Sequence, residues 1–237
     1  MDELDGLKIE WVKKGERTWL LENLDKRFFN PPMSPNTIKI ASLEADTNKL
    51  GPKPVWNKYE QLQDYNRSPE RSPDQVRISY KMGQFFEWLV KQKKPSIVAE
   101  FGTAFGFSGM YFLSGLEQNE HGKLLTFEPN KIWQEIAKKN LAVIGSRFKS
   151  IVGTFEENID IYLDKKIDLI FIDAIHTSEF MLPQFELVVE RTASGGLILL
   201  DDLNSSKDMA QCWEKISKDS RVKSALLVEG RVGMVEL

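Results

Sequence analysis

Four residues that could carry out acid–base or metal chemistry follow two apolar stretches of the chain. The stretch 168–172 ends at Asp173, with His176 three residues later, and a second apolar stretch ends at Asp201-Asp202. The carboxyl ends of neighbouring parallel strands share one edge of a sheet, so the three carboxylates are expected to converge. Like charges this close are unfavourable unless neutralised, and a hard divalent cation such as Mg²⁺ or Mn²⁺ suits an all-oxygen site. We therefore predict a metal site at Asp173, Asp201 and Asp202. In the alternative, one of the paired aspartates caps the following helix and the other faces water.

The chain contains two histidines, and His176 is the one placed to act as a general base. Its ordinary pKa of about 6.5 suits proton transfer at neutral pH. His121 lies in an Asn-Glu-His-Gly turn and is expected to face solvent. The alternative for His176 is a loop residue that packs against its neighbours.

The segment 97–108, with the sequence IVAEFGTAFGFS, predicts a strand that carries Glu100 and runs into a glycine turn before a helix. Gly102 and Gly106 allow the backbone to approach a ligand closely. The dinucleotide-binding spacing G-x-G-x-x-G is not met, because Ala104 stands where its second glycine would be. The segment therefore favours a cofactor without a pyrophosphate.

Glu128 ends the next predicted strand, 26 residues after Gly102, where a carboxylate can accept both hydroxyls of a ribose. The alternative is a solvated loop acid, or a charge at a helix N-terminus, next to Pro129. The strand after it leads into Thr154 and Phe155. These two residues either offer backbone amides and a ring to an adenine, or they begin a helix with Thr154 as its cap and Phe155 in the core.

Four motifs together resemble the class I S-adenosylmethionine-dependent methyltransferases, and among them the catechol and caffeoyl-CoA O-methyltransferases. The motifs are EFGTAFGFS, FEP, FIDAIH and GGLILLDD, and the resemblance covers roughly residues 72–237. It implies that Ser108 lies at the cofactor's carboxylate and Glu128 at its ribose. It implies that Asp173 and Asp201 ligate the metal, with Asp173 also beside the cofactor. His176 stands where metal-dependent relatives carry a lysine, and Asp202 where they carry an asparagine.

The residues predicted to bind S-adenosylmethionine are Glu100, Gly102, Thr103, Phe105, Gly106, Ser108, Glu128, Pro129, Thr154, Phe155 and Asp173. Those predicted to be catalytic are His176 and Asp173.

Length and composition fit one α/β domain with an extension. The 237 residues are 41% hydrophobic and carry a net charge of −3, so no basic surplus indicates nucleic acid. The single cysteine, Cys212, excludes an intramolecular disulfide and is expected to be a packing residue. The N-terminus lacks the apolar region of a signal peptide, and no apolar run is long enough to span a bilayer. We expect a cytoplasmic protein without a membrane or nucleic-acid partner.

Short apolar runs alternate with amphipathic segments, which predicts a doubly wound, mostly parallel seven-stranded sheet with an antiparallel C-terminal hairpin. The predicted strands are 97–101, 124–128, 148–152, 168–172, 197–200, 224–229 and 231–237. The first predicted helix begins at the capping box of Ser72 and Gln75. Five further helices are predicted at 107–118, 130–142, 155–163, 178–191 and 206–218.

Residues 1–70 are predicted to be a separate N-terminal extension, and residues 71–237 a Rossmann-like methyltransferase domain. The extension is rich in proline and aromatic residues. It either packs on the main domain as an arm, or forms a lid or a dimerisation segment that helps wall the substrate site.

These patterns together predict an S-adenosylmethionine-dependent O-methyltransferase that uses a divalent metal and acts on a hydroxyl of a small molecule. A catechol, a sugar and a natural-product intermediate all stay open as the acceptor. Two alternatives stay open: a metal-independent methyltransferase that uses His176 as base, and a non-catalytic cofactor-binding module. A homodimer is a further expectation, because relatives are often dimers.

Overall fold

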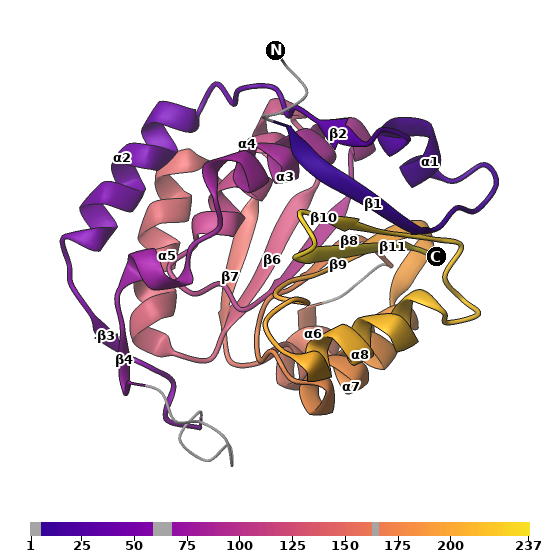
Figure 1. Cartoon of the computed structure of the whole chain (residues 1–237). Coiled ribbons are helices and arrows are strands. Elements are labelled where there is room, and N and C mark those ends of the chain that lie inside the picture. The colour runs from indigo at the N-terminus through magenta and orange to yellow at the C-terminus, as the bar shows by residue number, and fades with distance from the viewer. Residues whose placement is uncertain (1–5, 59–67, 163–165) are drawn as a thin grey trace. The chain divides into compact units, whose positions relative to one another are not determined.

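The computed structural model describes residues 6–58, 68–162 and 166–237. They have a mixed α/β fold with a large, mostly parallel central sheet and antiparallel edge strands (Figure 1). No helix among these residues is long and apolar enough to cross a membrane. Parts of the predicted N-terminal extension, residues 1–5 and 59–67, and the predicted helix end at 163 lie outside the described residues.

The chain divides into two compact units. Unit 1 comprises Met1–Pro31, Pro95–Glu100 and Leu163–Leu237, and unit 2 comprises Pro32–Lys94 and Phe101–Tyr162. The predicted extension therefore contributes residues to both units. Its role as a lid or dimerisation segment stays a prediction.

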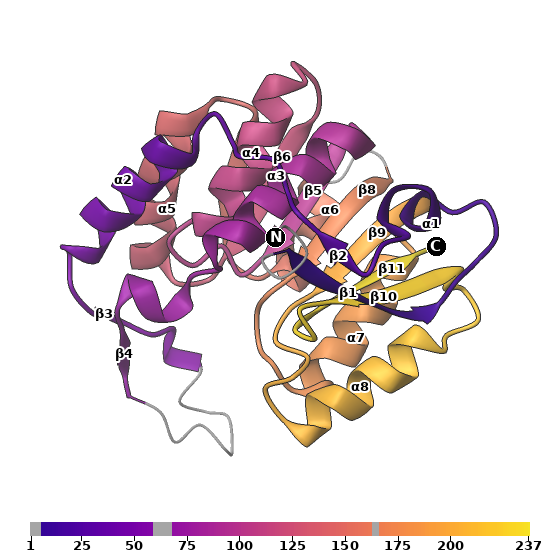
Figure 2. The same cartoon turned by 45° about the horizontal axis from the view of Figure 1, so that its top comes forward.

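Unit 1 contains most of the strands of the sheet. Its elements are β1 (Leu7–Lys13), α1 (Trp19–Leu24), β2 (Phe28–Phe29), β5 (Ile97–Phe101, whose last residue belongs to unit 2), β8 (Ile167–Ile172), α7 (Ser178–Val189), β9 (Thr192–Leu200), α8 (Lys207–Ser217), β10 (Ser224–Val228) and β11 (Val232–Glu236). The strand order is β2-β1-β10-β11-β9-β8-β5. The helices α7 and α8 lie side by side in both views (Figures 1 and 2).

The register of β8 and β9 brings their carboxyl ends to one edge of the sheet. The two strands are parallel, with Ile172 opposite Leu200. The amide of Asp201 then donates to the carbonyl of Ile172 at 3.0 Å. Both strands are buried apolar runs, which is the pattern of a sheet covered on both faces. This register places the residues that follow the two strands, including Asp173, next to one another.

The C-terminal hairpin of β10 and β11 is antiparallel, as predicted, and β11 pairs antiparallel with β9. All seven predicted strands are present within a few residues of their predicted bounds. Four further strands were not predicted, because periodicity is weak in the first 71 residues: β1 and β2 in this sheet, and the short β3 and β4, which pair with each other. β1 pairs antiparallel with β10, and β2 pairs with β1.

Unit 2 holds the remaining helices and a parallel strand pair. Its elements are α2 (Thr37–Asn48), β3 (Lys53–Pro54), β4 (Glu70–Arg71), the 3₁₀ helix η3 (Pro73–Val76), α3 (Tyr80–Lys93), α4 (Phe107–Gln118), β6 (Lys123–Glu128), α5 (Lys131–Ile144), β7 (Phe148–Val152) and α6 (Phe155–Tyr162). β6 and β7 are parallel, with Glu128 opposite Val152. α2 lies against α4 and α5 (Figures 1 and 2).

The helix predicted to run on from Ser72 is interrupted. Ser72 and Gln75 form the predicted capping box, but it begins only the short helix η3. Arg77 is extended, and Ser79 caps a new helix, α3, by accepting from the amide of Met82 at 3.2 Å. A second cap residue, seven positions after Ser72, therefore begins a separate helix.

Cys212 is fully buried in α8 and has a free thiol. Burial raises the pKa of this thiol to about 11. A buried, protonated thiol is a poor nucleophile, so the structure confirms the prediction that Cys212 is a packing residue.

Candidate functional site

The glycine turn after β5 needs its glycines. Gly102 and Gly106 have φ values of +84° and +88°, in the left-handed region that favours glycine. A Cβ atom on Gly106 would lie 3.2 Å from the Cα of Ala137 in α5. The amide of Gly102 donates to the carbonyl of Phe127 at 3.0 Å, which ties the turn to the end of β6. Both the fold of the turn and its approach to α5 therefore depend on the glycine spacing.

Glu128 is held beside this turn by backbone amides. Its Oε2 accepts from the amide of Ala104 and its Oε1 from the amide of Asn130, both at 2.8 Å. The side chain is buried, so the alternative of a solvated loop acid is wrong. Asn130 in turn caps α5 by accepting from the amide of Ile132 at 3.1 Å. Glu128 is thus a buried carboxylate of fixed orientation beside the glycine turn.

The N-terminus of α4 follows the same turn. Its N-cap is Gly106, and no side chain caps the helix. The first amides of a helix point out of it and, with the helix dipole, favour an anion. Ser108 lies in this first turn and is buried. The turn therefore combines a buried carboxylate with a helix N-terminus that has no side-chain cap, both within unit 2.

Two predicted cofactor residues in the turn direct their side chains into the core. Phe105 is fully buried and stacks on Trp133, with ring centroids 4.8 Å apart. The buried hydroxyl of Thr103 contacts that of Thr126. Contacts from these positions to a ligand would come from the backbone. Glu100 is fully buried in β5, and Pro129 is partly buried.

Thr154 and Phe155 begin α6, which agrees with the second of the two interpretations made from the sequence. Thr154 Oγ1 accepts from the amide of Glu157 at 3.3 Å, and Glu157 Oε2 accepts from the amide of Thr154 at 3.3 Å. Phe155 is buried, and its ring lies on that of Phe101 with centroids 3.4 Å apart. The ring of Phe155, which was a candidate to contact the adenine, is therefore packed against Phe101.

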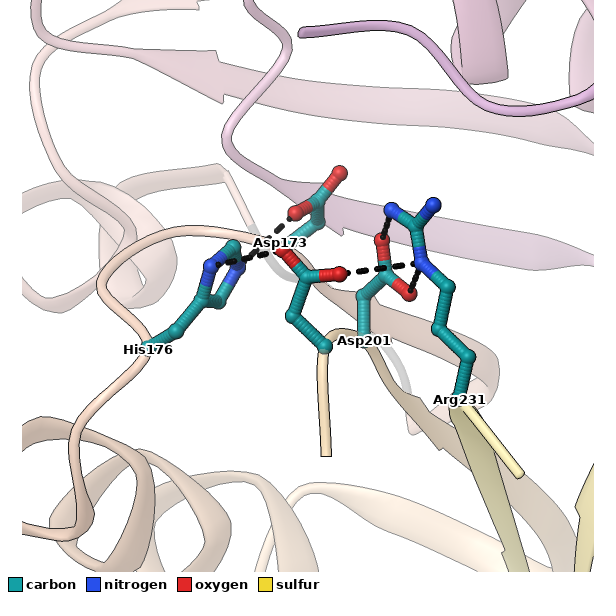
Figure 3. A network of polar contacts seen from close by, with 5 residues as sticks. Asp173, His176, Asp201 and Arg231 are labelled. Atoms are coloured by element: carbon teal, nitrogen blue, oxygen red, sulfur yellow. Dashed lines mark hydrogen bonds and ion pairs between the residues drawn. The ribbon is translucent and has the colours of Figure 1, made fainter. Parts of the chain in front are cut away.

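The predicted acids of unit 1 converge on His176. Its Nε2 lies 3.0 Å from Asp173 Oδ1, and its Nδ1 lies 3.1 Å from Asp202 Oδ2. Figure 3 shows the ring directed at Asp173. Ionised carboxylates only accept hydrogen bonds, so an imidazole held between two of them carries both protons. Burial lowers the pKa of His176, but the hydrogen bonds and charges of Asp173 and Asp202 outweigh it and raise the pKa to about 10. His176 is therefore a cation at neutral pH.

Arg231 binds the other side of the acid cluster. Its Nε and Nη2 donate to Oδ1 and Oδ2 of Asp201 at 2.8 and 2.6 Å, and its Nε lies 2.9 Å from Asp202 Oδ1 (Figure 3). Asp201 is fully buried. Burial and the charge of Asp173 raise the pKa of Asp201 to about 6, against the lowering by Arg231. A two-pronged pair of this kind fixes both side chains.

The oxygens of the predicted metal site already have side-chain partners. Both oxygens of Asp201 accept from Arg231, Asp202 Oδ1 lies 2.9 Å from Arg231 Nε, and Asp202 Oδ2 faces His176. The described residues contain no group of three histidine, cysteine or acidic side chains in a metal-binding arrangement. A divalent ion would have to compete with two cations for these oxygens. The cluster in this arrangement does not fit a metal.

Neither Asp201 nor Asp202 caps α8. Ser206 does so by accepting from the amide of Met209 at 3.1 Å. Asp202 instead has a φ of +54°, an uncommon value for a residue other than glycine and one that is more frequent at functional positions.

The sequence interpretation did not include Arg231 among the site residues. The sequence feature that could have indicated it is charge, because three converging acids require positive partners. Arg231 directly follows Gly230 in the hairpin turn. Its contribution depends on the pairing of β11 with β9, a long-range contact that local patterns do not specify.

The motif region of the chain matches known methyltransferases. A family model described as a methyltransferase domain matches residues 99–203. A protein of Mycolicibacterium smegmatis, provisionally named an O-methyltransferase, is 35% identical over 163 residues, which are 63% of this chain and 77% of the relative. A second relative with the same provisional name, from Mycobacterium avium, is 31% identical over 127 residues, which are 48% of this chain. The chain spans about half (56%) of the length of that relative.

The fold agrees with these matches. The structure of the Podospora anserina methyltransferase bound to S-adenosylhomocysteine has a TM-score of 0.60 with 18% identity, over 86% of this chain and 96% of that one. At this identity the likeness concerns the fold alone. With the sequence match to the Mycolicibacterium protein, the conclusion is that the chain belongs to the class I S-adenosylmethionine-dependent methyltransferases, in the O-methyltransferase family.

Proposed function

We propose that this chain transfers a methyl group from S-adenosylmethionine to a hydroxyl oxygen of a small molecule. The observation that carries the proposal is Glu128, a buried carboxylate held by two backbone amides beside the glycine turn. S-adenosylmethionine, when bound, supplies an electrophilic methyl group, so the protein's task is to bind, orient and control a proton.

The residues of unit 2 would bind the cofactor. Glu128 accepts hydrogen bonds from the ribose hydroxyls, and the amides at the start of α4, with Ser108, bind the carboxylate. Gly102 and Gly106 leave room for close approach because neither carries a Cβ atom. The other predicted cofactor residues stay predictions: Glu100, Thr103, Phe105, Pro129, Thr154, Phe155 and Asp173.

In this proposal Asp173 accepts the proton that leaves the substrate hydroxyl, and His176 is the cation that pairs with Asp173. An imidazole that already carries both protons has no lone pair for a third, so His176 in this state cannot act as the predicted base. It can instead stabilise the negative charge that develops on the attacking oxygen as the proton leaves. Asp173 Oδ1 accepts from His176, and its second oxygen can take the proton.

A metal-independent reaction is the form of this function that the ion pairs favour. This form replaces the predicted ion, Mg²⁺ or Mn²⁺ at Asp173, Asp201 and Asp202, which the ion pairs disfavour. Arg231 and His176 already neutralise these carboxylates, which was the reason for expecting a metal. The homodimer and the cytoplasmic location stay predictions as well.

Turnover with a panel of acceptors tests the proposal. The purified chain is incubated with S-adenosylmethionine and, separately, with catechols, simple sugars and hydroxylated polyketides, and S-adenosylhomocysteine is quantified by mass spectrometry. We expect its release with at least one acceptor, together with a product heavier by one CH₂ group. Binding of S-adenosylhomocysteine without turnover of any acceptor would favour the non-catalytic module.

A further inference from the structure

Arg231 contacts two of the three carboxylates that were predicted to hold a metal. Its guanidinium spans both oxygens of Asp201, at 2.6 and 2.8 Å, and its Nε lies 2.9 Å from Asp202. The planar fork of a guanidinium matches a carboxylate in this way and stays charged at all physiological pH values.

The backbone also places Arg231 at this position. Its amide donates to the carbonyl of Val228 at 3.1 Å across the hairpin turn, in which Glu229 and Gly230 both have positive φ. Its carbonyl accepts from the amide of Leu203 at 3.0 Å. The turn is thereby attached to the segment that carries Asp201 and Asp202, so the contact is part of the fold of unit 1.

The carboxylates of the cluster already have side-chain partners without any added ion. Arg231, which is always charged, binds Asp201 and Asp202, and the ring of His176 lies between Asp173 and Asp202. Asp201 is fully buried, and a buried carboxylate needs a paired charge. A divalent ion at the same oxygens would lie within contact range of a fixed guanidinium, which opposes its binding.

We propose that Arg231 is a positioning residue that holds Asp201 and Asp202 in place of a divalent cation, so that methyl transfer by this chain needs no divalent metal. The part that concerns turnover rests on the proposed function. The part that concerns metal binding rests on the geometry of unit 1 alone.

Binding of Mn²⁺, followed by electron paramagnetic resonance, tests the structural part. We compare the wild-type chain with Arg231→Gln and Arg231→Lys. The control is Arg221→Gln, which removes an arginine of unit 1 that pairs with Glu186 and Asp219 outside the cluster. The wild type, Arg231→Lys and the control should bind Mn²⁺ no more tightly than about 1 mM, and Arg231→Gln at least about tenfold more tightly.

One Mn²⁺ bound tightly by the wild type, and lost in Asp201→Asn, would overturn the proposal. Arg231→Gln leaves Asp201 buried without its partner, so its folding is checked by circular dichroism. If this variant does not fold, the wild type and Arg231→Lys decide the question, since tight binding by either contradicts the proposal.

Turnover provides the second readout. Wild-type activity should stay within about twofold after exhaustive dialysis against EDTA and after addition of Mg²⁺. Arg231→Gln should lose at least about tenfold in kcat, and Arg231→Lys should recover part of it, because a lysine keeps the charge but not the fork. Loss of wild-type activity on chelation, restored by Mg²⁺, would overturn the proposal. Absence of any turnover would count against the proposed function instead, and the Mn²⁺ comparison would still test Arg231.

Discussion

The glycine turn of unit 2 and the acid cluster of unit 1 are built in different ways. In the turn, backbone amides hold one carboxylate, and the φ values of two glycines set the shape. In the cluster, charged side chains from two strand ends and a hairpin neutralise one another. A site made by local backbone geometry can be predicted from a short motif, whereas a site made by ion pairs between distant segments depends on the whole fold.

The largest expected effect separates the two sites by function. His176→Ala should lower kcat by about 10² to 10³, because it removes the cation that we propose to stabilise the reacting oxygen. Its dissociation constant for S-adenosylhomocysteine should stay within about threefold of the wild-type value, since the turn of unit 2 is unchanged. Steady-state kinetics and calorimetry measure the two. His121→Ala, at the exposed histidine, is the control. Equal losses in kcat and affinity would contradict the division of roles.

Gly106→Ala should have the opposite profile. The new Cβ would lie 3.2 Å from Ala137, and residue 106 would have to keep the left-handed backbone conformation of Gly106. We therefore expect about a thirtyfold loss of affinity for S-adenosylhomocysteine and a loss of about 2 kcal/mol of stability. Gly51→Ala is the matched control, because Gly51 has a φ of +67° and nothing within 4 Å of the added atom. Calorimetry and urea unfolding measure both. Equal loss of affinity in both variants would show that strain, rather than position, is responsible.

The pH dependence of stability tests the charge state of His176. Its pKa is raised from 6.5 to about 10, so the protonated ring stabilises the folded chain. The contribution is fully present below pH 6.5 and is lost as the pH rises through about 10. The difference in free energy of unfolding between the wild type and His176→Gln should be on the order of 2 kcal/mol at pH 6 and should shrink toward pH 10. A difference that grows with pH would mean that His176 is neutral in the folded chain.

The smallest expected effect concerns Thr154. If Thr154 is only a helix cap, Thr154→Ala should cost about 1 kcal/mol of stability and leave the affinity for S-adenosylhomocysteine within about twofold. Thr154→Ser keeps the hydroxyl and should behave as the wild type. A tenfold loss of affinity in the alanine variant would support the prediction that this residue contacts the cofactor.

Much of the fold was predictable because its signals are local. Apolar runs such as 168–172 and the glycine turn at Gly102 predicted strands and turns close to their observed bounds. The break at Ser79 and the strand β1 were missed, because a competing cap and an irregular edge strand leave weak patterns. Arg231 was missed for another reason. Its partner Asp201 lies 30 residues away, and their contact exists only after β9 and β11 have paired.

Calorimetric titration of the wild type and of Glu128→Ala with S-adenosylhomocysteine tests the central claim most directly. We predict one site in the wild type and a loss of at least about 100-fold in affinity in the variant, because the ribose hydroxyls lose their carboxylate acceptor. Glu135→Ala, in the helix that follows, serves as the control. Absence of heat with the folded wild type, or unchanged affinity in Glu128→Ala, would contradict the account.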